Sequence, residues 1–264
     1  MKPTEPATRS RYNIEALERG LEILALFTPD TPTLSLTQIV EILNLNKSTA
    51  YRVLSTLEGL NYVERDPNTR LYRPGLKVLR LGFAAISGLE VREVAHPFLV
   101  KLSQDVGETV SLAVLDGFYT VYVDRVRNQA IVGVVLGVGS RLPAHCSSLG
   151  KVLLSDLPGD ELERRLAQAE LISFAPNTIS NKQDLISELA KVRQHGYAVG
   201  DEELAVGLRA AAAPIRDISH RVIAAINATG ATINISYERL ENEIIPALLE
   251  TALQISTALG YSPN

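Results

Sequence analysis

The sequence predicts an α+β protein built from two modules, and three observations support this prediction. The chain has 264 residues, whereas a single domain usually has about 100–200. Basic side chains gather in the first third of an otherwise acidic chain. Short helical patterns and a hairpin fill that first third, while β-rich runs interleaved with helical patterns fill the rest. The composition, with 46% apolar and 21% charged residues, excludes a disordered or fibrous protein.

The basic charge is local. The net charge of the chain is −4, yet residues 43–80 contain seven basic and three acidic side chains. Such an asymmetry is typical of a small nucleic-acid-binding module attached to another domain. On charge alone, an ordinary solvated surface explains this window equally well. Its basic residues are Lys47, Arg52, Arg65, Arg70, Arg73, Lys77 and Arg80.

Three short helices are predicted near the start of the chain, after a disordered tail at residues 1–12. Apolar residues at helical spacing predict helices over 13–27 and 36–43, the second with Ser35 as its N-cap. A tight turn leads to a third helix, which begins after the N-cap Asn46. Two short helices joined by a tight turn have the layout of a helix-turn-helix.

The third predicted helix has an apolar face and a polar face. Ala50, Val53, Leu54 and Leu57 recur at spacings of three and four, so they form the inward stripe. A helix fits the major groove of DNA, where hydroxyl, Lys and Arg groups of its first turns reach base edges and phosphates. The candidate DNA-contacting residues of this helix are Lys47, Ser48, Thr49, Tyr51 and Arg52.

A β-hairpin with basic residues near its tip follows the third helix. Two β-rich runs flank the turn residues Asp66-Pro67-Asn68, and Arg70 and Arg73 lie on the returning side. This order of elements favours a winged helix-turn-helix DNA-binding domain over residues 13–74. The alternative is an ordinary helical hairpin packed on a ribbon. A helical pattern over 75–90 then predicts a linker helix.

Residues 91–264 are predicted to form a domain with a mainly antiparallel sheet flanked by helices. The turn Asp116-Gly117-Phe118 separates β-rich runs at 109–115 and 119–126, and a third run follows at 131–136. Helices are predicted at about 147–155, 159–169, 181–195 and 238–259, and further strands at 197–199, 210–215 and 222–229.

The sequence predicts no catalytic or metal site and no cofactor. The four His residues lack metal-ligand spacing, and no Gly-rich phosphate loop opens a helix. Cys146 beside His145 suggests a nucleophile with a base, but adjacent side chains rarely face each other, so a buried pair is the preferred interpretation. A small-molecule-binding enzyme with an accessory DNA-binding-like domain remains the alternative.

A small-ligand pocket is the better candidate for the C-terminal domain. A helix is predicted to begin near Ser148 and Leu149, and the N–H groups and dipole of a helix N-terminus suit a carboxylate. Asn227 and Thr229 alternate along a predicted strand, so both point to one face. Local capping and pairing explain these polar groups equally well. The nearest basic candidates for a charge partner of the ligand are Arg141 and Arg209.

A series of motifs runs through the chain in a fixed order: IEALERGLEIL from Ile14, KSTAYRVL from Lys47, YRPG from Tyr72, RLPAH from Arg141, LGKVLL from Leu149, GYAVGDEEL from Gly196, GLR from Gly207 and APIRD from Ala213. Over about residues 12–260 these motifs resemble the isocitrate lyase regulator (IclR) family. The runs RLPA from Arg141, GLR from Gly207 and VIAAIN from Val222 most resemble the branch that regulates aromatic-acid and β-ketoadipate catabolism.

The resemblance implies a winged helix-turn-helix, a linker helix and a GAF-like effector-binding domain, assembled as a homodimer or dimer of dimers. It implies double-stranded operator DNA and a small organic acid effector as partners, and no catalysis. Members that bind small keto-acids often have Cys where this chain has Ala210 and Asp where it has Gly200, so a larger, flatter ligand such as an aromatic acid or a ring-cleavage product is expected. By position, the implied pocket residues are Ser148, Leu149, Gly200, Asp201, Leu208, Ala210, Asn227 and Thr229.

The chain is expected to be cytoplasmic, with no membrane partner. Residues 1–11 are polar and lack the charged-then-apolar pattern of a leader. The longest uncharged stretches, 128–140 and 222–237, are too short or too polar to span a bilayer.

Overall fold

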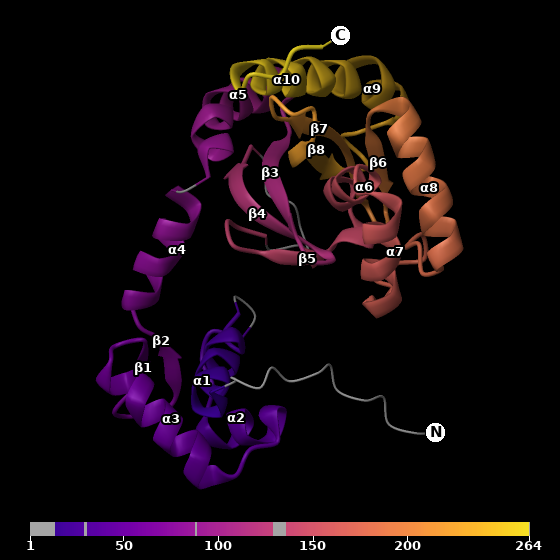
Figure 1. The fold of residues 1–264 in the computed structure, drawn as a ribbon. Coiled ribbons are helices and arrows are strands. Elements are labelled where there is room, and N and C mark those ends of the chain that lie inside the picture. The colour runs from indigo at the N-terminus through magenta and orange to yellow at the C-terminus, as the bar shows by residue number, and fades with distance from the viewer. Residues whose placement is uncertain (1–13, 29–30, 88, 129–135, 264) are drawn as a thin grey trace. The chain divides into compact units, whose positions relative to one another are not determined.

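In the computed structural model the chain folds into two units, Met1–Ala85 and Ile86–Asn264 (Figure 1). The structure describes residues 14–28, 31–87, 89–128 and 136–263. The predicted tail at 1–12 lies outside the described residues. So does the predicted strand at 131–136, except for Leu136, which is not part of a strand.

The described N-terminal unit begins with short helices joined by capped turns and continues into a hairpin. Ser35 and Gln38 form a capping box: Ser35 Oγ accepts from the Gln38 N–H at 3.2 Å, and Gln38 Oε1 accepts from the Ser35 N–H at 2.8 Å. Asn44 ends α2 with a left-handed φ of 49°, and Asn46 caps α3 by accepting from the Thr49 N–H at 2.8 Å. The elements are α1 (Glu15–Ala25), α2 (Leu36–Leu43), α3 (Lys47–Gly59), β1 (Val63–Arg65) and β2 (Tyr72–Pro74).

One apolar core holds these elements together. Its fully or almost fully buried members are Ile23, Leu34, Ile39, Leu54, Val63 and Tyr72. The backbones of Leu34 and Tyr72 exchange two hydrogen bonds, of 3.0 and 2.8 Å, which join the hairpin to the segment before α2. Because α3 buries Ala50 and Leu54 against this core, its opposite face is exposed.

The predicted linker helix is observed as α4 (Lys77–Ser87), and a separate helix, α5 (Glu90–Val106), follows it. Lys77 attaches the start of α4 to the preceding residues. Its Nζ donates to the Leu60 carbonyl oxygen at 3.1 Å and lies 4.8 Å from the centroid of the Tyr62 ring.

The C-terminal unit is built on an antiparallel sheet with the strand order β5-β4-β3-β8-β7-β6. The predicted antiparallel sheet is therefore confirmed, while the short strand β5, which pairs with β4, was not predicted. The strands are β3 (Thr109–Asp116), β4 (Tyr119–Val126), β5 (Arg141–Pro143), β6 (Ala198–Asp201), β7 (Leu208–Arg216) and β8 (Val222–Ala231).

Helices cover both faces of this sheet (Figure 1). α5 and α10 pack on one face, against alternate apolar residues such as Leu112, Ala213 and Ile226. α6 packs on the other face, against residues such as Ala113 and Ala212, and α8 packs on α6. The remaining elements are η1 (Ala144–Cys146), α6 (Ser148–Ser155), α7 (Gly159–Gln168), α8 (Lys182–His195), α9 (Tyr237–Arg239), η2 (Leu240–Ile244) and α10 (Ile245–Ala258).

A β-bulge interrupts the pairing of β4 with β3. Leu112 pairs with Asp124 and Ala113 pairs with Tyr122, so Val123 is the extra residue on β4. A bulge bends the strand and changes the face to which the following side chains point.

The bulge places Val123 and Asp124 together on the α5 face. Val123 belongs to the core beneath α5, and the Asp124 carboxylate lies 2.7 Å from His96 Nδ1 of α5. Tyr122 and Arg125 therefore both face α6, although strict alternation would place residues three apart on opposite faces.

Gly150 permits the close packing of α6 on η1. A Cβ atom at this position would lie 2.0 Å from the Ala144 carbonyl oxygen, so any side chain must displace backbone. We predict that Gly150→Ala lowers the free energy of unfolding by about 3 kcal/mol, because overpacking of this kind shifts backbone. Urea denaturation of the full chain measures this change.

Gly159→Ala is the matched control, since a Cβ at the start of α7 has no heavy atom within 4 Å. Its free energy of unfolding should be unchanged or higher by up to about 1 kcal/mol. An equal decrease in the free energy of unfolding in Gly150→Ala and Gly159→Ala would contradict the packing constraint at Gly150.

Candidate functional site

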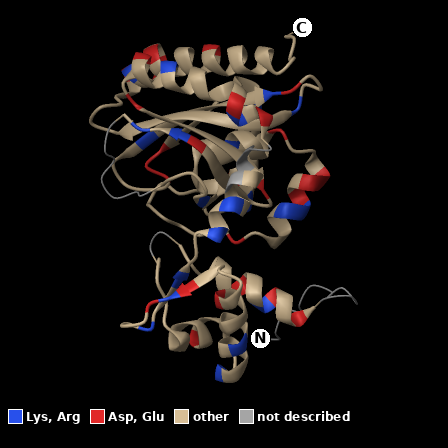
Figure 2. Cartoon of the chain, turned by 90° about the vertical axis from the view of Figure 1, so that its left-hand side faces the viewer, with Lys and Arg blue, Asp and Glu red and all other residues tan. Residues whose placement is uncertain are grey.

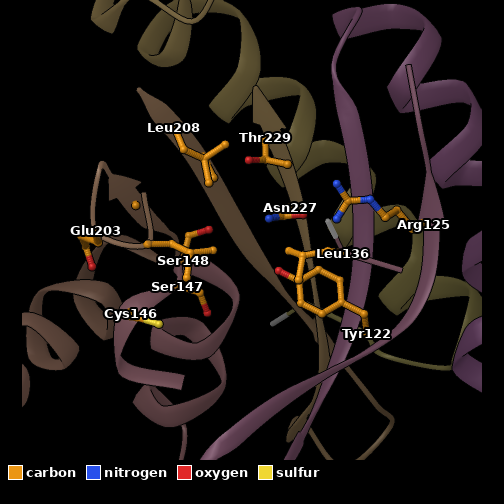
Figure 3. Close-up of a pocket in the computed structure, with 13 residues that line it drawn as sticks. Tyr122, Arg125, Leu136, Cys146, Ser147, Ser148, Glu203, Leu208, Asn227 and Thr229 are labelled. Carbon is orange, nitrogen blue, oxygen red and sulfur yellow. The ribbon is translucent and has the colours of Figure 1, made fainter. Parts of the chain in front are cut away.

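A pocket opens on the α6 face of the C-terminal sheet (Figure 3). Strands β4, β7 and β8 provide one wall, and the start of α6 with the loop after β6 provides the other. The space between the lining atoms, including the open mouth, is about 480 Å³. The pocket is lined by Tyr122, Arg125, Leu136, Cys146, Ser147, Ser148, Gly200, Glu203, Leu204, Leu208, Ala210, Asn227 and Thr229.

The structure brings most of the predicted ligand-binding residues together in this pocket. Strand register explains the grouping: Ala210 of β7 pairs with Gly200 of β6 on one side and with Thr229 of β8 on the other. The predicted residues that line the pocket are Ser148, Gly200, Leu208, Ala210, Asn227 and Thr229.

Leu149 and Asp201 do not line the pocket, contrary to the prediction. Leu149 is fully buried in the apolar core between α6 and the sheet. It follows Ser148 in the first turn of α6, and successive helix residues point in different directions, so only one of the two faces the cavity.

Asp201 is held by two neighbouring side chains instead. Arg209 Nε donates to its Oδ1 at 2.7 Å, and the Tyr237 hydroxyl donates to its Oδ2 at 2.5 Å. Burial favours a higher pKa for Asp201, but these two hydrogen bonds outweigh it and hold the pKa below its ordinary value. The carboxylate is therefore ionised and already paired.

Neither predicted charge partner reaches the pocket. Arg209 also donates from Nη1 to the Ile235 carbonyl oxygen at 2.6 Å and stacks on the Tyr237 ring. Arg141 is half exposed, lies 3.7 Å from the centroid of the Tyr119 ring, and places Nη2 3.3 Å from the Asp116 carboxylate. Both cations have protein partners outside the cavity.

Arg125 supplies a cation to the pocket, and it was not among the predicted residues. Its Nε and Nη1 atoms are buried and have no hydrogen-bond partner among the described residues. Burial lowers the pKa of Arg125. The sequence offered little signal for it, because its direction depends on the β-bulge rather than on alternation along β4.

Ser111 lies between Arg125 and Asn227 in the sheet. On β3 it pairs with Arg125 of β4 on one side and with Asn227 of β8 on the other. In the part of the chain that the structure describes, Ser111 Oγ, Asn227 Oδ1 and Ser148 Oγ are buried without a hydrogen-bond partner. Such atoms are rare in folded proteins because each costs free energy, so this pocket has hydrogen-bonding capacity that a polar ligand would satisfy.

Lys151 fixes the wall of the pocket opposite the sheet. Its side chain is 1% exposed, and its Nζ donates to Glu203 Oε1 and to the Val199 carbonyl oxygen, both at 2.6 Å. Burial raises the pKa of Glu203, against the opposing effect of the Lys151 ammonium group. This buried ion pair joins α6 to the loop that follows β6.

Cys146 and His145 are engaged with backbone rather than with each other. The Cys146 thiol donates to the Pro143 carbonyl oxygen at 3.2 Å, and burial raises its pKa to about 12, which leaves negligible thiolate at neutral pH. His145 is fully buried with Nε2 3.0 Å from the Ile172 carbonyl oxygen, and burial lowers its pKa. The described contacts do not form a nucleophile with a base.

The described residues hold neither a candidate metal cluster nor a candidate membrane-spanning helix. They contain no group of three or more His, Cys, Asp or Glu side chains placed to hold a metal ion. None of the described helices combines the length and the hydropathy needed to cross a membrane.

The second candidate site is the exposed surface formed by the start of α3 and the hairpin. The predicted residues Lys47, Ser48, Tyr51 and Arg52 are exposed, and Thr49 is half-buried beside them. Arg70 is exposed near the hairpin tip, whereas Arg73 is ion-paired across the hairpin, with its Nη2 2.8 Å from Glu64 Oε2. Figure 2 shows basic and acidic residues at separate places along the ribbon of each unit.

Both units match known families and proteins. Residues 16–67 match the IclR helix-turn-helix domain, and residues 83–257 match the bacterial transcriptional regulator IclR C-terminal domain. The HTH-type transcriptional regulator XynR of Escherichia coli (strain K12) is 34% identical over 248 residues, which cover 94% of this chain and 98% of XynR. The HTH-type transcriptional repressor AllR of the same strain is 33% identical over 265 aligned positions, covering 100% and 97% of the two chains.

Solved structures share the fold. A crystal structure of an IclR homolog complexed with 4-hydroxybenzoate from Microbacterium hydrocarbonoxydans is 28% identical to this chain, with a TM-score of 0.76. The match covers 94% of this chain and 100% of that one. The likeness therefore extends over both units and not over the C-terminal domain alone.

Proposed function

The chain belongs to the IclR family of bacterial transcriptional regulators, and we propose that a small organic acid bound in the α6-face pocket controls its binding to operator DNA. As a member of this family it is a transcriptional regulator rather than an enzyme, with a DNA-binding helix-turn-helix and a C-terminal effector-binding domain. We propose that it acts in the bacterial cytoplasm, as a regulator of operator DNA must, because its relatives are bacterial transcriptional regulators.

The observation that best supports the effector proposal is the set of buried, unpartnered polar atoms that face one cavity. Arg125 contributes a positive charge, and Asn227 and Ser148 contribute neutral donors or acceptors. Ligand sites typically combine apolar walls with a few such polar groups, and Leu136, Leu204 and Leu208 supply apolar lining here.

We propose an aromatic acid or a ring-cleavage product as the effector, and regulation of aromatic catabolism as the role. Two observations support this class. The IclR homolog from Microbacterium hydrocarbonoxydans was crystallised with 4-hydroxybenzoate. Gly200 and Ala210 are small residues that lie side by side on paired strands of the pocket wall, so neither side chain fills the cavity.

Effector binding changes the affinity for DNA only if the protein has two conformations that bind the effector with different affinities. A ligand that binds both conformations equally well does not shift the equilibrium between them. We propose that α4 is the element that differs between these arrangements. It begins at the hairpin of the DNA-binding domain, where Lys77 contacts Leu60 and Tyr62, and ends before α5.

We propose that α3 reads bases and that the hairpin contacts phosphates. Arg52→Ala should weaken specific binding by about 1–3 kcal/mol if its guanidinium contacts a base. Arg70→Ala should weaken specific and non-specific binding alike and reduce the salt slope by about one unit. Fluorescence anisotropy over a range of salt concentrations, with an operator selected from random-sequence duplexes, measures both effects.

Arg164→Ala, which removes an exposed guanidinium from α7, is the control and should leave DNA affinity unchanged. Arg73→Ala should have a smaller effect on the salt slope than Arg70→Ala, because Glu64 already neutralises this guanidinium. Unchanged operator affinity in a variant lacking Arg52, Arg70 and Arg73 would contradict the assignment.

We propose a homodimer, or a dimer of dimers, in which α1 and α4 pair with a second copy. Leu17 and Leu21 of α1 are each 59% exposed, and Leu79 of α4 is 55% exposed, which leaves apolar faces without cover. The side chain of Phe83, a further predicted contact, lies outside the described part of the structure. A dimer also places two recognition helices on paired half-sites, from which useful specificity arises.

Analytical ultracentrifugation at micromolar concentration tests this assembly. The wild type should be dimeric or larger, and a Leu17→Glu, Leu21→Glu double variant should dissociate, because four charges would then meet in one interface. Ile233→Glu, at a position 90% exposed in the other unit, is the control. A monomeric wild type would contradict the proposal.

We predict that filling the pocket abolishes effector binding. The double variant Ser148→Leu, Asn227→Leu replaces two unpartnered polar groups with bulkier apolar ones, so its affinity for 4-hydroxybenzoate should fall at least about 100-fold. Calorimetry on the full chain measures the affinity, with Ser187→Leu on the exposed side of α8 as the control. If the double variant kept the wild-type affinity, the ligand would have to bind outside this pocket.

A further inference from the structure

We propose that Arg125, with Ser111 beside it, binds the carboxylate of the effector, and that the start of α6 binds a second oxygen of the same molecule. The pocket would then select acids that carry a hydroxyl or keto oxygen away from the carboxylate. This inference rests on the proposed function, because it states which group of the effector lies at each end of the pocket. It reverses the expectation that the α6 N-terminus holds the carboxylate.

No carboxylate among the described residues forms an ion pair with Arg125. The neighbouring Asp124 points to the opposite face of the sheet, where it is engaged by His96 and lies 4.0 Å from Arg92. The pocket carboxylate of Glu203 is paired with Lys151. Residues 129–135, which are not described, contain no Asp or Glu in their sequence.

Arg125 is half-buried and its Cζ lies 6.0 Å from the centroid of the Tyr122 ring, but its buried Nε and Nη1 atoms have no described hydrogen-bond partner, and an anionic ligand would supply one. A buried cation without a partner is unfavourable, since burial deprives the guanidinium of water without replacing its hydrogen bonds. A carboxylate restores both the charge balance and the hydrogen bonds to Nε and Nη1. A bound carboxylate therefore explains why this guanidinium has no acceptor among the described residues.

Ser111 and Asn227 extend the anion site along the sheet. The three residues occupy one cross-strand row, with Ser111 in the middle, and side chains of such neighbours lie about 5 Å apart at Cβ. Ser111 does not line the pocket, but its buried Oγ lies next to Arg125 in the sheet without a described hydrogen-bond partner, so a carboxylate that reaches Arg125 would offer it an acceptor. Asn227, one strand further along, is placed to bind the middle of the ligand.

The opposite wall offers a different kind of site. Ser148 presents an unpartnered hydroxyl at the first turn of α6, facing the strands that carry Arg125 and Asn227 (Figure 3). Gly200 keeps this turn accessible, since a Cβ at 200 would approach the Ser148 nitrogen to 3.3 Å. The start of α6 offers hydroxyl and N–H groups but no unpaired cation, so it is suited to a neutral hydroxyl or keto oxygen. The carboxylate forms a stronger, charge-assisted hydrogen bond with Arg125.

The first test is the stability of the ligand-free full chain. Arg125→Gln removes a half-buried charge that no described carboxylate pairs, so the melting temperature should stay the same or rise. The control Arg141→Gln removes a guanidinium that is paired with Asp116 and stacked on Tyr119. A larger fall in melting temperature for Arg125→Gln than for Arg141→Gln would show that Arg125 is structural and would overturn the proposal.

The second test compares 4-hydroxybenzoate with the neutral 4-hydroxybenzamide by calorimetry. The wild type and Arg141→Gln should prefer the acid at least about tenfold, because a charge-assisted hydrogen bond is lost in the amide. Arg125→Gln should bind the acid and the amide with equal affinity, and Arg125→Lys should recover part of the preference. A preference for the acid that persists in Arg125→Gln overturns the proposal.

The outcomes separate this inference from the proposed function. In one outcome, acids bind the wild type but not the Ser148→Leu, Asn227→Leu variant, while Arg125→Gln still prefers the acid over the amide. This outcome supports the effector pocket and contradicts only the proposed position of the carboxylate. If formate, acetate, pyruvate, benzoate and 4-hydroxybenzoate all fail to bind the wild type, the effector proposal and this inference both fail.

Discussion

The position of β3 between β4 and β8 is the constraint on which the C-terminal unit depends. Its pairing with both neighbours aligns two apolar layers, one beneath α5 and α10 and the other beneath α6. The same register sets Arg125, Ser111 and Asn227 in one row, and the bulge at Val123 turns Arg125 towards α6. Core and pocket are therefore two consequences of one set of strand contacts.

The pocket combines rigid walls with unsatisfied polar atoms. Lys151 and Glu203 hold the loop after β6 against α6, and Arg209, Asp201 and Tyr237 hold the adjoining end of the sheet. These ion pairs have partners within the protein, although Glu203, which also lines the cavity, leaves Oε2 buried without a described partner. Asn227 Oδ1, Ser148 Oγ and the Nε and Nη1 atoms of Arg125 have no described partner and are available to a ligand.

Much of the structure was predictable because its signals are local. The N-caps Ser35 and Asn46 and the apolar stripe of α3 mark the helices of the N-terminal unit within a few residues of chain. Alternation in β3 and β8 and the turn at Gly117 likewise locate strands. The pocket was partly predictable, since Asn227 and Thr229 lie on one face of one strand. Leu149 and Asp201 were misplaced because their environments are set by contacts from outside their own segments.

The sequence by itself determined the order of elements, the DNA-binding layout and the family, since caps, periodicity and motifs are encoded over short stretches. Only the tertiary structure decided which cation serves the pocket. Arg141 and Arg209 each pair with a carboxylate, whereas Arg125 has only the Tyr122 ring near its guanidinium and no described carboxylate partner. That outcome depends on a bulge and on strands distant in sequence, so it exists only once the sheet has formed.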